Sequence, residues 1–490
     1  MKKTIIRALS LALVLLMIVG MLVACKKDKE DDKDGTPTDA NSLRYNGEEI
    51  NILGRGEQSQ IREYFEKAED VMGHAVNEAI YNRNVYTTDS LNITTTYKET
   101  KDANAVSDAT IAHQAGGTYD VYNIYSLYAS TLTVQGLYTN LKQFEFFDTN
   151  EPWYPSKLVG DATINGKLYF VSGDISTTNI FMSSLIYYNK EIYTNKQVGT
   201  KLKTNYGYDS IYDMVRDKKW TYEAMFTLSK GIYADTDNSK AKSDGDTFGF
   251  ITYKTLYDNF YYGAGLTTIT STAEGLKLSD GFKNTNKISS VLTAVNGFFI
   301  TSDGMTWNID NGHGPAQQAF SEKRALFYLA PASHAYTTFR NVSDLTYGVL
   351  PVPMYEASQD AGYQASLSNP YAIYGVASAS DTPEIAAAYL HILGKYSYEI
   401  TRPVFFDETM KLKYSENVDD SEMWDLVINS QSYDLGKVFC EQIGTGSPTV
   451  SNFRDCIVQG TTDWGGKLNA NRGPINNSLK TLNASLAELE

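Results

Sequence analysis

The chain has 490 residues and a formal net charge of −15 at pH 7, with 43 lysines and arginines against 58 aspartates and glutamates. A polyanion is repelled by nucleic acid, and no basic segment interleaved with aromatic residues offsets the charge, so nucleic-acid binding is excluded as a main function. The length is too great for one hydrophobic core and predicts two domains of about 200 residues each.

The N-terminus has the three-part pattern of an export signal. Three basic residues within the first seven positions precede an apolar run at 8–24, and this order is typical of a signal that directs secretion. Leu22-Val23-Ala24-Cys25 resembles the lipobox of bacterial lipoproteins, which implies cleavage before Cys25 and acylation of its thiol. We therefore expect residues 1–24 to be a lipoprotein signal peptide. An uncleaved membrane anchor and a plain secretory signal are left open as alternatives.

Nine consecutive charged residues follow Cys25, at positions 26–34. Four lysines and five acidic residues make this run nearly neutral and too polar to fold. With the polar residues beyond it, the run predicts a lipid-anchored flexible stalk at residues 25–45. The globular part would then be held at the extracellular face of the cell membrane. Cleavage would remove three positive charges and leave the mature chain with a formal charge of −18.

Tyrosine is the dominant aromatic residue, with 36 copies against 20 phenylalanines and 5 tryptophans. Its ring stacks and its hydroxyl makes hydrogen bonds, both on one stiff side chain. This suits a polar ligand with apolar faces, such as a sugar. An extracellular surface that simply tolerates tyrosine would have the same composition.

Strand and helix patterns alternate after the stalk. Their periodicities predict, in chain order, a strand at 49–53, a helix around 76–85, a strand at 91–97, a helix at 104–114 and a strand at 119–125. This order is typical of a doubly wound α/β unit. Ligands of such units bind beyond the carboxyl ends of the strands, which here lie near Arg55 and near Tyr125 to Tyr128.

Later segments predict a second unit of the same kind. Asn165-Gly166 between two strand-like runs predicts a hairpin, and a further strand begins at residues 184–190. Thr221 is expected to cap a helix, with the preceding Trp220 packed in the core, and Thr382-Pro383 is expected to open another helix.

Sequence signatures of catalysis are absent. The chain has no phosphate loop, no Gly-x-Ser-x-Gly elbow and no paired-histidine zinc helix, and its five histidines are scattered. The acidic loop at 235–246 superficially resembles a calcium loop, but Lys240 stands where such a loop needs glycine. We therefore expect no metal, no cofactor and no enzymatic activity. A carboxylate pair for glycoside hydrolysis, which has no fixed sequence spacing, is left open.

Two cysteines, Cys440 and Cys456, remain besides the predicted lipidation site. Both lie in segments that resemble parts of packed helices. We expect two free thiols rather than a required bridge, although export permits a disulfide.

The order of motifs over some 350 residues resembles one family. The motifs are Gly54-Arg55-Gly56 after the first strand, Tyr119-Asp120-Val121, Asn165-Gly166-Lys167-Leu168-Tyr169, Tyr188-Asn189-Lys190, Lys219-Trp220-Thr221-Tyr222-Glu223, the run 320–327, the run 347–353 and the helix from Thr382. With the lipobox before them, they resemble the extracellular solute-binding proteins, family 1, of ABC importers. One departure is the run Ser321-Glu322-Lys323-Arg324, which lacks the glycine of the family's Phe-x-x-Gly-Lys-Ala motif and leaves the turn there open.

This resemblance implies an α/β fold of two doubly wound lobes joined by a hinge, the type II periplasmic-binding-protein fold, which closes on a ligand between its lobes. It implies an N-terminal lobe of residues 46–183 and 370–400, and a C-terminal lobe of residues 184–369 and 401–490. The chain would cross between the lobes near 183–187, near 371–375 and again after about residue 400.

Nine residues are candidates for ligand binding, because they lie at strand ends or near the lobe crossings. They are Arg55, Glu57, Tyr125, Tyr128, Asp174, Asn179, Trp307, His334 and Tyr371. Aromatic rings stack on sugar rings, while charged and amide groups bind sugar hydroxyls. Roles as solvated turn charges for Arg55 and Glu57, and in hinge packing for Tyr371, are left open.

These features predict a carbohydrate-binding lipoprotein that works as a monomer without catalysis. It would deliver a mono- or oligosaccharide to the permease subunits of an ABC importer. A surface-anchored carbohydrate-active enzyme is the alternative from another class, and a sugar sensor or adhesin on the same fold is a third.

Overall fold

The computed structural model describes residues 40–56, 61–307, 313–406, 418–443 and 451–489. The predicted signal peptide, Cys25 and most of the predicted stalk lie outside these residues, and so does Glu57. Within the described ranges, no helix combines the length and the apolar character that crossing a membrane requires.

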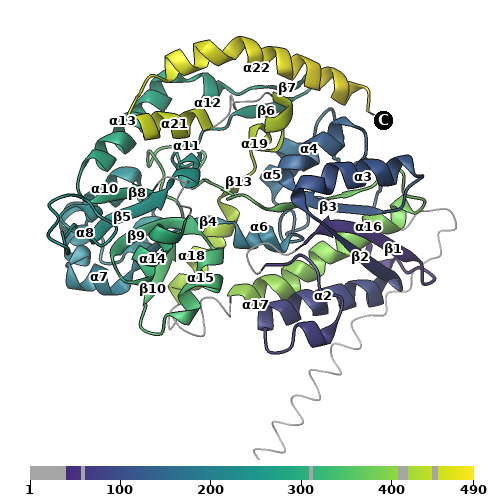
Figure 1. The fold of residues 1–490 in the computed structure, drawn as a ribbon, viewed down its shortest axis with the longest axis horizontal. Helices are drawn as coiled ribbons and strands as arrows, with labels where there is room; N and C mark the ends of the chain where they lie inside the picture. The colour runs from purple at the N-terminus through teal and green to yellow at the C-terminus, as the bar shows by residue number, and fades with distance from the viewer. Residues whose placement is uncertain (1–39, 57–60, 308–312, 407–417, 444–450, 490) are drawn as a thin grey trace, which may run out of the picture. The chain divides into compact units, whose positions relative to one another are not determined.

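The first of two larger sheets has four strands in the order β12-β3-β1-β2 (Figure 1). β1 pairs in parallel with β2 and β3, whereas β12 comes from much later in the chain and is antiparallel to β3. Helices α2 and α16 pack together on one side of this sheet, and α3 and α4 pack together on the other. The elements of this part are β1 (Glu49–Arg55), α2 (Ala75–Leu91), β2 (Thr94–Thr100), α3 (Ala105–Gln114), β3 (Val121–Tyr125), α4 (Ser126–Val134), α5 (Ser156–Ala162), α6 (Thr177–Phe181), β12 (Ala372–Val376) and α16 (Pro383–Tyr396).

The second sheet has five strands in the order β10-β4-β9-β5-β8. β5 runs parallel to β8 and β9, and β4 is antiparallel to both β9 and β10. All residues of β5 and β9 are buried, as expected for strands that are covered on both faces. The elements here are β4 (Ser184–Asn189), α7 (Lys190–Asn195), α8 (Val198–Tyr206), α9 (Ile211–Arg216), α10 (Tyr222–Ser229), β5 (Phe248–Tyr253), α11 (Asp258–Tyr262), β6 (Ile269–Thr272), β7 (Gly275–Leu278), α12 (Asp280–Lys283), α13 (Thr285–Ile300), β8 (Gly304–Trp307), α14 (Gly314–Ser321), β9 (Ala325–Pro331), α15 (Ser333–Thr337) and β10 (Tyr347–Leu350).

A C-terminal segment, α18 to α22, contacts both sheet layers. α18 packs on β10, α19 and α20 pack on α4, α21 packs on α11 and α13, and the long α22 touches β7, α13 and α4 (Figure 1). Residues 435–443, which the sequence assigns to the second lobe, therefore contact the first sheet's layer as well. The elements of this segment are α18 (Val418–Asn429), β13 (Gln431–Ser432), α19 (Leu435–Val438), α20 (Cys440–Ile443), α21 (Ser451–Gln459) and α22 (Trp464–Ala487). Earlier in the chain lie β11 (Ala365–Ser366), which pairs with β13, and α17 (Arg402–Phe406).

Helix boundaries follow the local sequence signals at most predicted positions. Thr221 caps α10, since its hydroxyl accepts a hydrogen bond from the backbone N–H of Ala224 (3.3 Å), and Trp220 is fully buried, both as predicted. The strand predicted at 91–97 begins only at Thr94. Helix α2 extends further than its pattern suggested, and Asn92 ends it in the left-handed region (φ 52°).

The predicted hairpin at Asn165-Gly166 is present as a tight turn. Both residues have positive φ, 51° and 79°, as a two-residue turn of type I′ requires. The flanking Ile164 and Lys167 form a single β-bridge rather than long paired strands.

Lys323 ends helix α14 with a φ of 59°, a conformation that favours glycine. The backbone N–H of Arg324 donates to the carbonyl of Ala319 (2.8 Å), and that of Lys323 donates to Phe320 (3.0 Å). These two bonds form a Schellman cap. The turn that the sequence left open is therefore a helix C-cap in which lysine takes the position of glycine, and the lysine ammonium pairs with Asp344 (2.7 Å).

Glu63 ties the first sheet's layer to the segment that leads into the second sheet. Its buried carboxylate accepts hydrogen bonds from the backbone N–H groups of Thr177 (2.8 Å) and Thr178 (3.0 Å), from the hydroxyl of Ser176 (2.9 Å) and from Tyr374 in β12 (3.0 Å). Hydrogen bonds to a charged acceptor are the strong ones. Glu63 therefore fixes α6 just before the chain enters β4.

Replacing Glu63 with alanine should lower the free energy of unfolding by about 3 kcal/mol, because several buried donors lose their acceptor at once. Urea unfolding of the full chain measures this. Glu66→Ala is the matched control: Glu66 is exposed, so its loss should change stability by less than about 0.5 kcal/mol. Equal effects of the two substitutions would contradict the role of Glu63.

Candidate functional site

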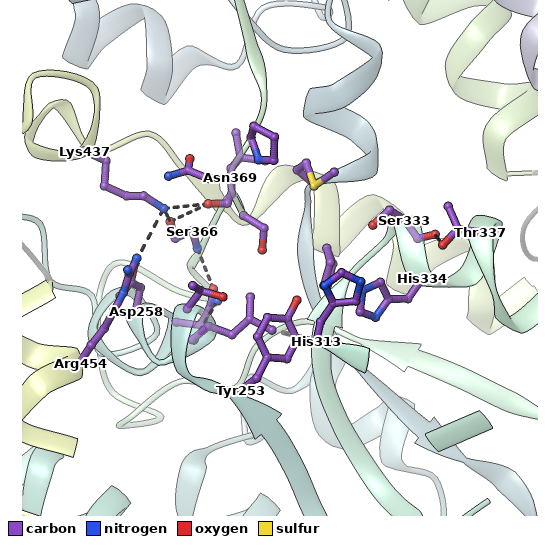
Figure 2. Close-up of a pocket in the computed structure, with 18 residues that line it drawn as sticks. Tyr253, Asp258, His313, Ser333, His334, Thr337, Ser366, Asn369, Lys437 and Arg454 are labelled. Atoms are coloured by element: carbon purple, nitrogen blue, oxygen red, sulfur yellow. Dashed lines mark hydrogen bonds and ion pairs between the residues drawn. The ribbon is translucent and has the colours of Figure 1, made fainter. Parts of the chain in front are cut away.

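Residues 351–371 run from β10 in the second sheet to β12 in the first and are called the crossing segment below. A cavity of about 340 Å³ lies where the second sheet meets this segment and the C-terminal segment (Figure 2). Residues 253–259 after β5 and 331–337 after β9 form one wall, and His313 joins them after β8. Residues 366–370 of the crossing segment form another wall, and Lys437 and Arg454 enter from the C-terminal segment. The cavity thus occupies the carboxyl ends of parallel strands, where α/β sheets bind ligands.

Asp258 and Arg454 form an ion pair at the edge of the cavity. The guanidinium donates from Nε and Nη2 to the two carboxylate oxygens of Asp258, a two-bond geometry that fixes both side chains. Asp258 is 1% exposed. The pair therefore attaches α21 to α11.

Lys437 stands beside this pair with its ammonium toward the crossing segment (Figure 2). It donates to the hydroxyl of Ser366 (2.7 Å) and the carbonyl of Leu367 (2.8 Å), and its Nζ lies 3.9 Å from Asp258 Oδ2. Burial lowers the pKa of Lys437 to about 8, while the carboxylate of Asp258 opposes the shift. The side chain is therefore mostly charged at pH 7.

His334 points into the cavity from α15 (Figure 2). Its Nδ1 lies 3.1 Å from the hydroxyl of the fully buried Tyr328. No other acceptor for that hydroxyl is found among the described residues, so the hydroxyl donates to Nδ1 and the proton of the neutral ring is on Nε2. The rings of Tyr253 and His313 lie beside it, with centroids 6.4 and 5.2 Å away.

Of the nine residues that the sequence nominates, His334 lines this cavity. Trp307 is the last residue of β8, and its backbone pairs in register with Tyr253, another lining residue. The side chain of Trp307 and the whole of Glu57 lie outside what the structure describes.

Three nominated residues form a cluster at the carboxyl ends of β1 and β3. Arg55 is 2% exposed and donates from Nε and Nη2 to the carboxylate of Asp102, at 2.7 Å each. Its guanidinium lies over the ring of Tyr125 (5.2 Å), which meets the ring of Tyr128 edge-on (5.6 Å). Arg55 is therefore a buried ion-pair partner, whereas Tyr125 and Tyr128 are partly buried.

The other three nominated residues lie around the lobe crossings. Asp174 pairs with Arg402 (3.1 Å), and burial raises its pKa to about 6 against the effect of that guanidinium. The amide of Asn179 donates to the hydroxyl of Tyr433, whose ring meets that of Tyr371 edge-on (6.2 Å). All five side chains pack where chain segments cross, so they are suited to a hinge.

Lys437, Arg454 and Asp258 are missing from the sequence-based set. Lys437 is a lone charge inside the apolar run Leu435–Phe439, a pattern that indicates a buried lysine and could have drawn attention to it. Nothing local indicates Arg454.

The acidic loop brings oxygens of Asp235, Asp237 and Asp246 within 4.8 Å of one another. The loop itself supplies their hydrogen bonds: Asp246 accepts from Thr236 N (3.0 Å), and Asp237 accepts from Ser243 Oγ (2.7 Å). The cluster is thus bonded within the loop. Cys440 and Cys456 are free thiols in α20 and α21, as expected.

The stability of the fold should depend on the protonation of His334. Burial and the neighbouring His313 lower its pKa from 6.5 to about 3. At a pH between these two values, His334 is protonated in the unfolded state but not in the folded state. Stability is therefore lost as pH falls below about 6.5. Between pH 7 and pH 5 the loss is about 2 kcal/mol.

His334→Gln removes this titration and keeps a polar group of similar reach. Urea unfolding at pH 7 and pH 5 should show a smaller decrease in stability for the variant, by about 2 kcal/mol, than for the wild type. The titration of Asp174 changes stability in the opposite direction, since its raised pKa favours the folded state at low pH. This contribution is the same in the wild type and the variant, so it cancels in the comparison. Identical pH dependences would show that His334 titrates normally.

Solved structures with the same architecture are solute-binding proteins. The extracellular solute-binding protein of Staphylococcus aureus in complex with maltose superposes with a TM-score of 0.57 at 11% identity, over 90% of this chain and all of that one. The maltose-binding protein of Listeria monocytogenes in complex with maltose gives 0.54 at 14% identity, over 89% and 98%. The sugar-binding protein of Xanthomonas citri gives 0.54 at 11% identity, over 90% and 98%.

No protein-family model matches the sequence, and no curated protein matches it. The similarity to the solved structures extends over nearly the whole chain. It confirms the predicted α/β fold, the type II periplasmic-binding-protein fold with two doubly wound units.

Proposed function

We propose that this chain is a lipid-anchored, extracellular solute-binding protein that captures a carbohydrate and delivers it to the permease of an ABC importer. The two sheets would form the cores of its lobes, residues 46–183 with 370–400 and residues 184–369 with 401–490. The protein binds its ligand and performs no chemistry on it. Three similar structures of the same fold are described as sugar-binding, or as complexes with maltose.

The observation that carries this proposal is the position of the cavity. It opens at the carboxyl ends of β5, β8 and β9 and against the crossing residues 366–370. A ligand there would touch both a sheet and a segment that moves when lobes close. The volume of about 340 Å³ is at the lower end of the range for small-molecule sites, roughly 300–1,000 Å³, so it suits one or two sugar rings.

A thermal-shift screen of the full chain against saccharides and peptides tests the ligand class. A ligand at 100 times its dissociation constant stabilises the folded state by about 2.7 kcal/mol. We expect at least one saccharide to raise the melting temperature with a dependence on its concentration. Stabilisation by peptides alone would contradict carbohydrate binding.

The membrane anchor is tested with Cys25→Ser, because the proposal places the lipid on that thiol. Wild-type protein should sediment with the membranes of a bacterial host that processes lipoproteins, and the variant should be found in the medium or soluble fraction. Cys440→Ser, which keeps Cys25, serves as the control and should behave as the wild type. If Cys25→Ser still sediments quantitatively with membranes, the apolar run at 8–24 is itself the anchor.

A further inference from the structure

We infer that the cavity recognises an acidic saccharide, whose anionic group binds between Lys437 and Arg454. This inference rests on the proposed function and adds the chemical class of the ligand. It follows from the charges that line the cavity and from the hydrogen bonds those charges already make.

The charges of the cavity do not cancel. Its described lining holds two cations, Lys437 and Arg454, and one carboxylate, Asp258. Arg454 takes both oxygens of Asp258, so this pair is neutral as a unit. Lys437 is left with two neutral acceptors, Ser366 Oγ and Leu367 O, and with a carboxylate 3.9 Å away that is already engaged. The charged groups that line the cavity therefore sum to one positive charge.

A second carboxylate, that of Asp434, favours the charged form of Lys437 from outside the cavity. Asp434 is 2% exposed and does not line the cavity. Its oxygens accept hydrogen bonds from Tyr262 OH (2.9 Å), from Thr268 N (2.8 Å) and Oγ1 (2.7 Å), and from Gly436 N (2.8 Å). Asp434 therefore does not contact a ligand in the cavity, whereas an anion bound beside Lys437 would meet a lining of net charge +1.

The free hydrogen-bonding groups of the cavity are strong donors. Within the described part of the chain, Nη1 of Arg454 makes no hydrogen bond, and Nε2–H of His334 has no acceptor. A neutral sugar hydroxyl can accept a hydrogen bond from these donors, but a charged donor binds it less strongly than it binds an anion. A carboxylate or sulfate accepts several hydrogen bonds and donates none, so it matches a set of cationic and neutral donors.

The remaining lining suits the sugar that carries the anion. Tyr253 presents an aromatic ring beside the two histidines, and Asn369, Ser333 and Thr337 present amide and hydroxyl groups around the same space (Figure 2). An aromatic face with scattered polar groups is typical of a site for a ring with hydroxyl groups. The carboxylate of a uronic acid and the sulfate of a sulfated sugar share the required chemistry.

Calorimetric titration of the full chain with matched ligands tests the inference. The ligands are digalacturonate, its methyl ester, a sulfated disaccharide and the neutral maltose. Methyl esterification removes the charge and leaves the sugar in place, so digalacturonate should bind at least tenfold more tightly than its ester. Preference for the sulfated disaccharide over all the others would assign the anion to a sulfate instead.

Lys437→Met keeps an unbranched side chain that is one atom shorter and removes its charge. It should weaken binding of the preferred acidic ligand at least tenfold, about 1.4 kcal/mol, and leave the weak binding of neutral ligands unchanged. Lys190→Met is the matched control: Lys190 also pairs with a buried carboxylate, that of Asp420 (3.1 Å), but it does not line the cavity. It changes the net charge equally and should not alter affinity.

The wild type supplies a second readout that needs no variant. Lys437 loses its charge above a pKa of about 8, and the groups that face it are Asp258, Arg454, Asp434 and the thiol of Cys440, whose pKa burial raises to about 11. Affinity for the acidic ligand should therefore fall about tenfold between pH 7 and pH 9.

Failure of every acidic saccharide to bind more tightly than its neutral counterpart overturns the inference. Tight binding of neutral saccharides would then leave the proposed function standing. Absence of binding by all saccharides would overturn both. Equal effects of Lys437→Met and Lys190→Met would show that the loss of affinity comes from the change in net charge and not from contact with the ligand, and would remove Lys437 from the site.

Discussion

The architecture of the cavity depends on the buried carboxylate of Asp258. A carboxylate that is 1% exposed must find a partner, since an unpaired ion at that depth costs several kcal/mol. Its partner, Arg454, lies 196 positions later in the chain. The C-terminal segment therefore has to return to α11, and when it does so it brings Lys437 to the crossing residues.

Other buried polar groups also need partners, and their hydrogen bonds fix the walls around the cavity. The amide of Asn259, next to Asp258, accepts a hydrogen bond from the backbone N–H of Ser366 (2.8 Å). Asp434 accepts from Tyr262 at the end of α11 and from Thr268 just before β6, and so holds the start of α19 against these two elements. Buried polar groups thus join α11, the crossing segment and the C-terminal segment at one place. Such groups need specific partners, so they hold a precise geometry.

Elements with a clear local pattern could be predicted from the sequence, and contacts between distant segments could not. Strands such as β1 and β4 have continuous apolar or alternating runs, and Thr221 marks a helix start by its own hydrogen bond. His334 could be nominated because it directly follows a strand. Arg454 and Asp258 have no such signal, because α11 is only five residues long and the pairing is set by tertiary packing. For Arg55 the local signal was misleading. It lies at a strand end, as ligand-binding residues often do, but it pairs with Asp102 and does not line the cavity.

Hydrogen–deuterium exchange of the full chain, with and without the saccharide that binds most tightly, tests most directly where the ligand binds. A ligand orders the backbone groups around it, so the account predicts slower exchange at residues 253–259, 331–337 and 366–370 and around Lys437, the segments that form the cavity. Protection confined to residues 142–166 and 271–273, which line a separate cavity, with no change in the former segments, would contradict it.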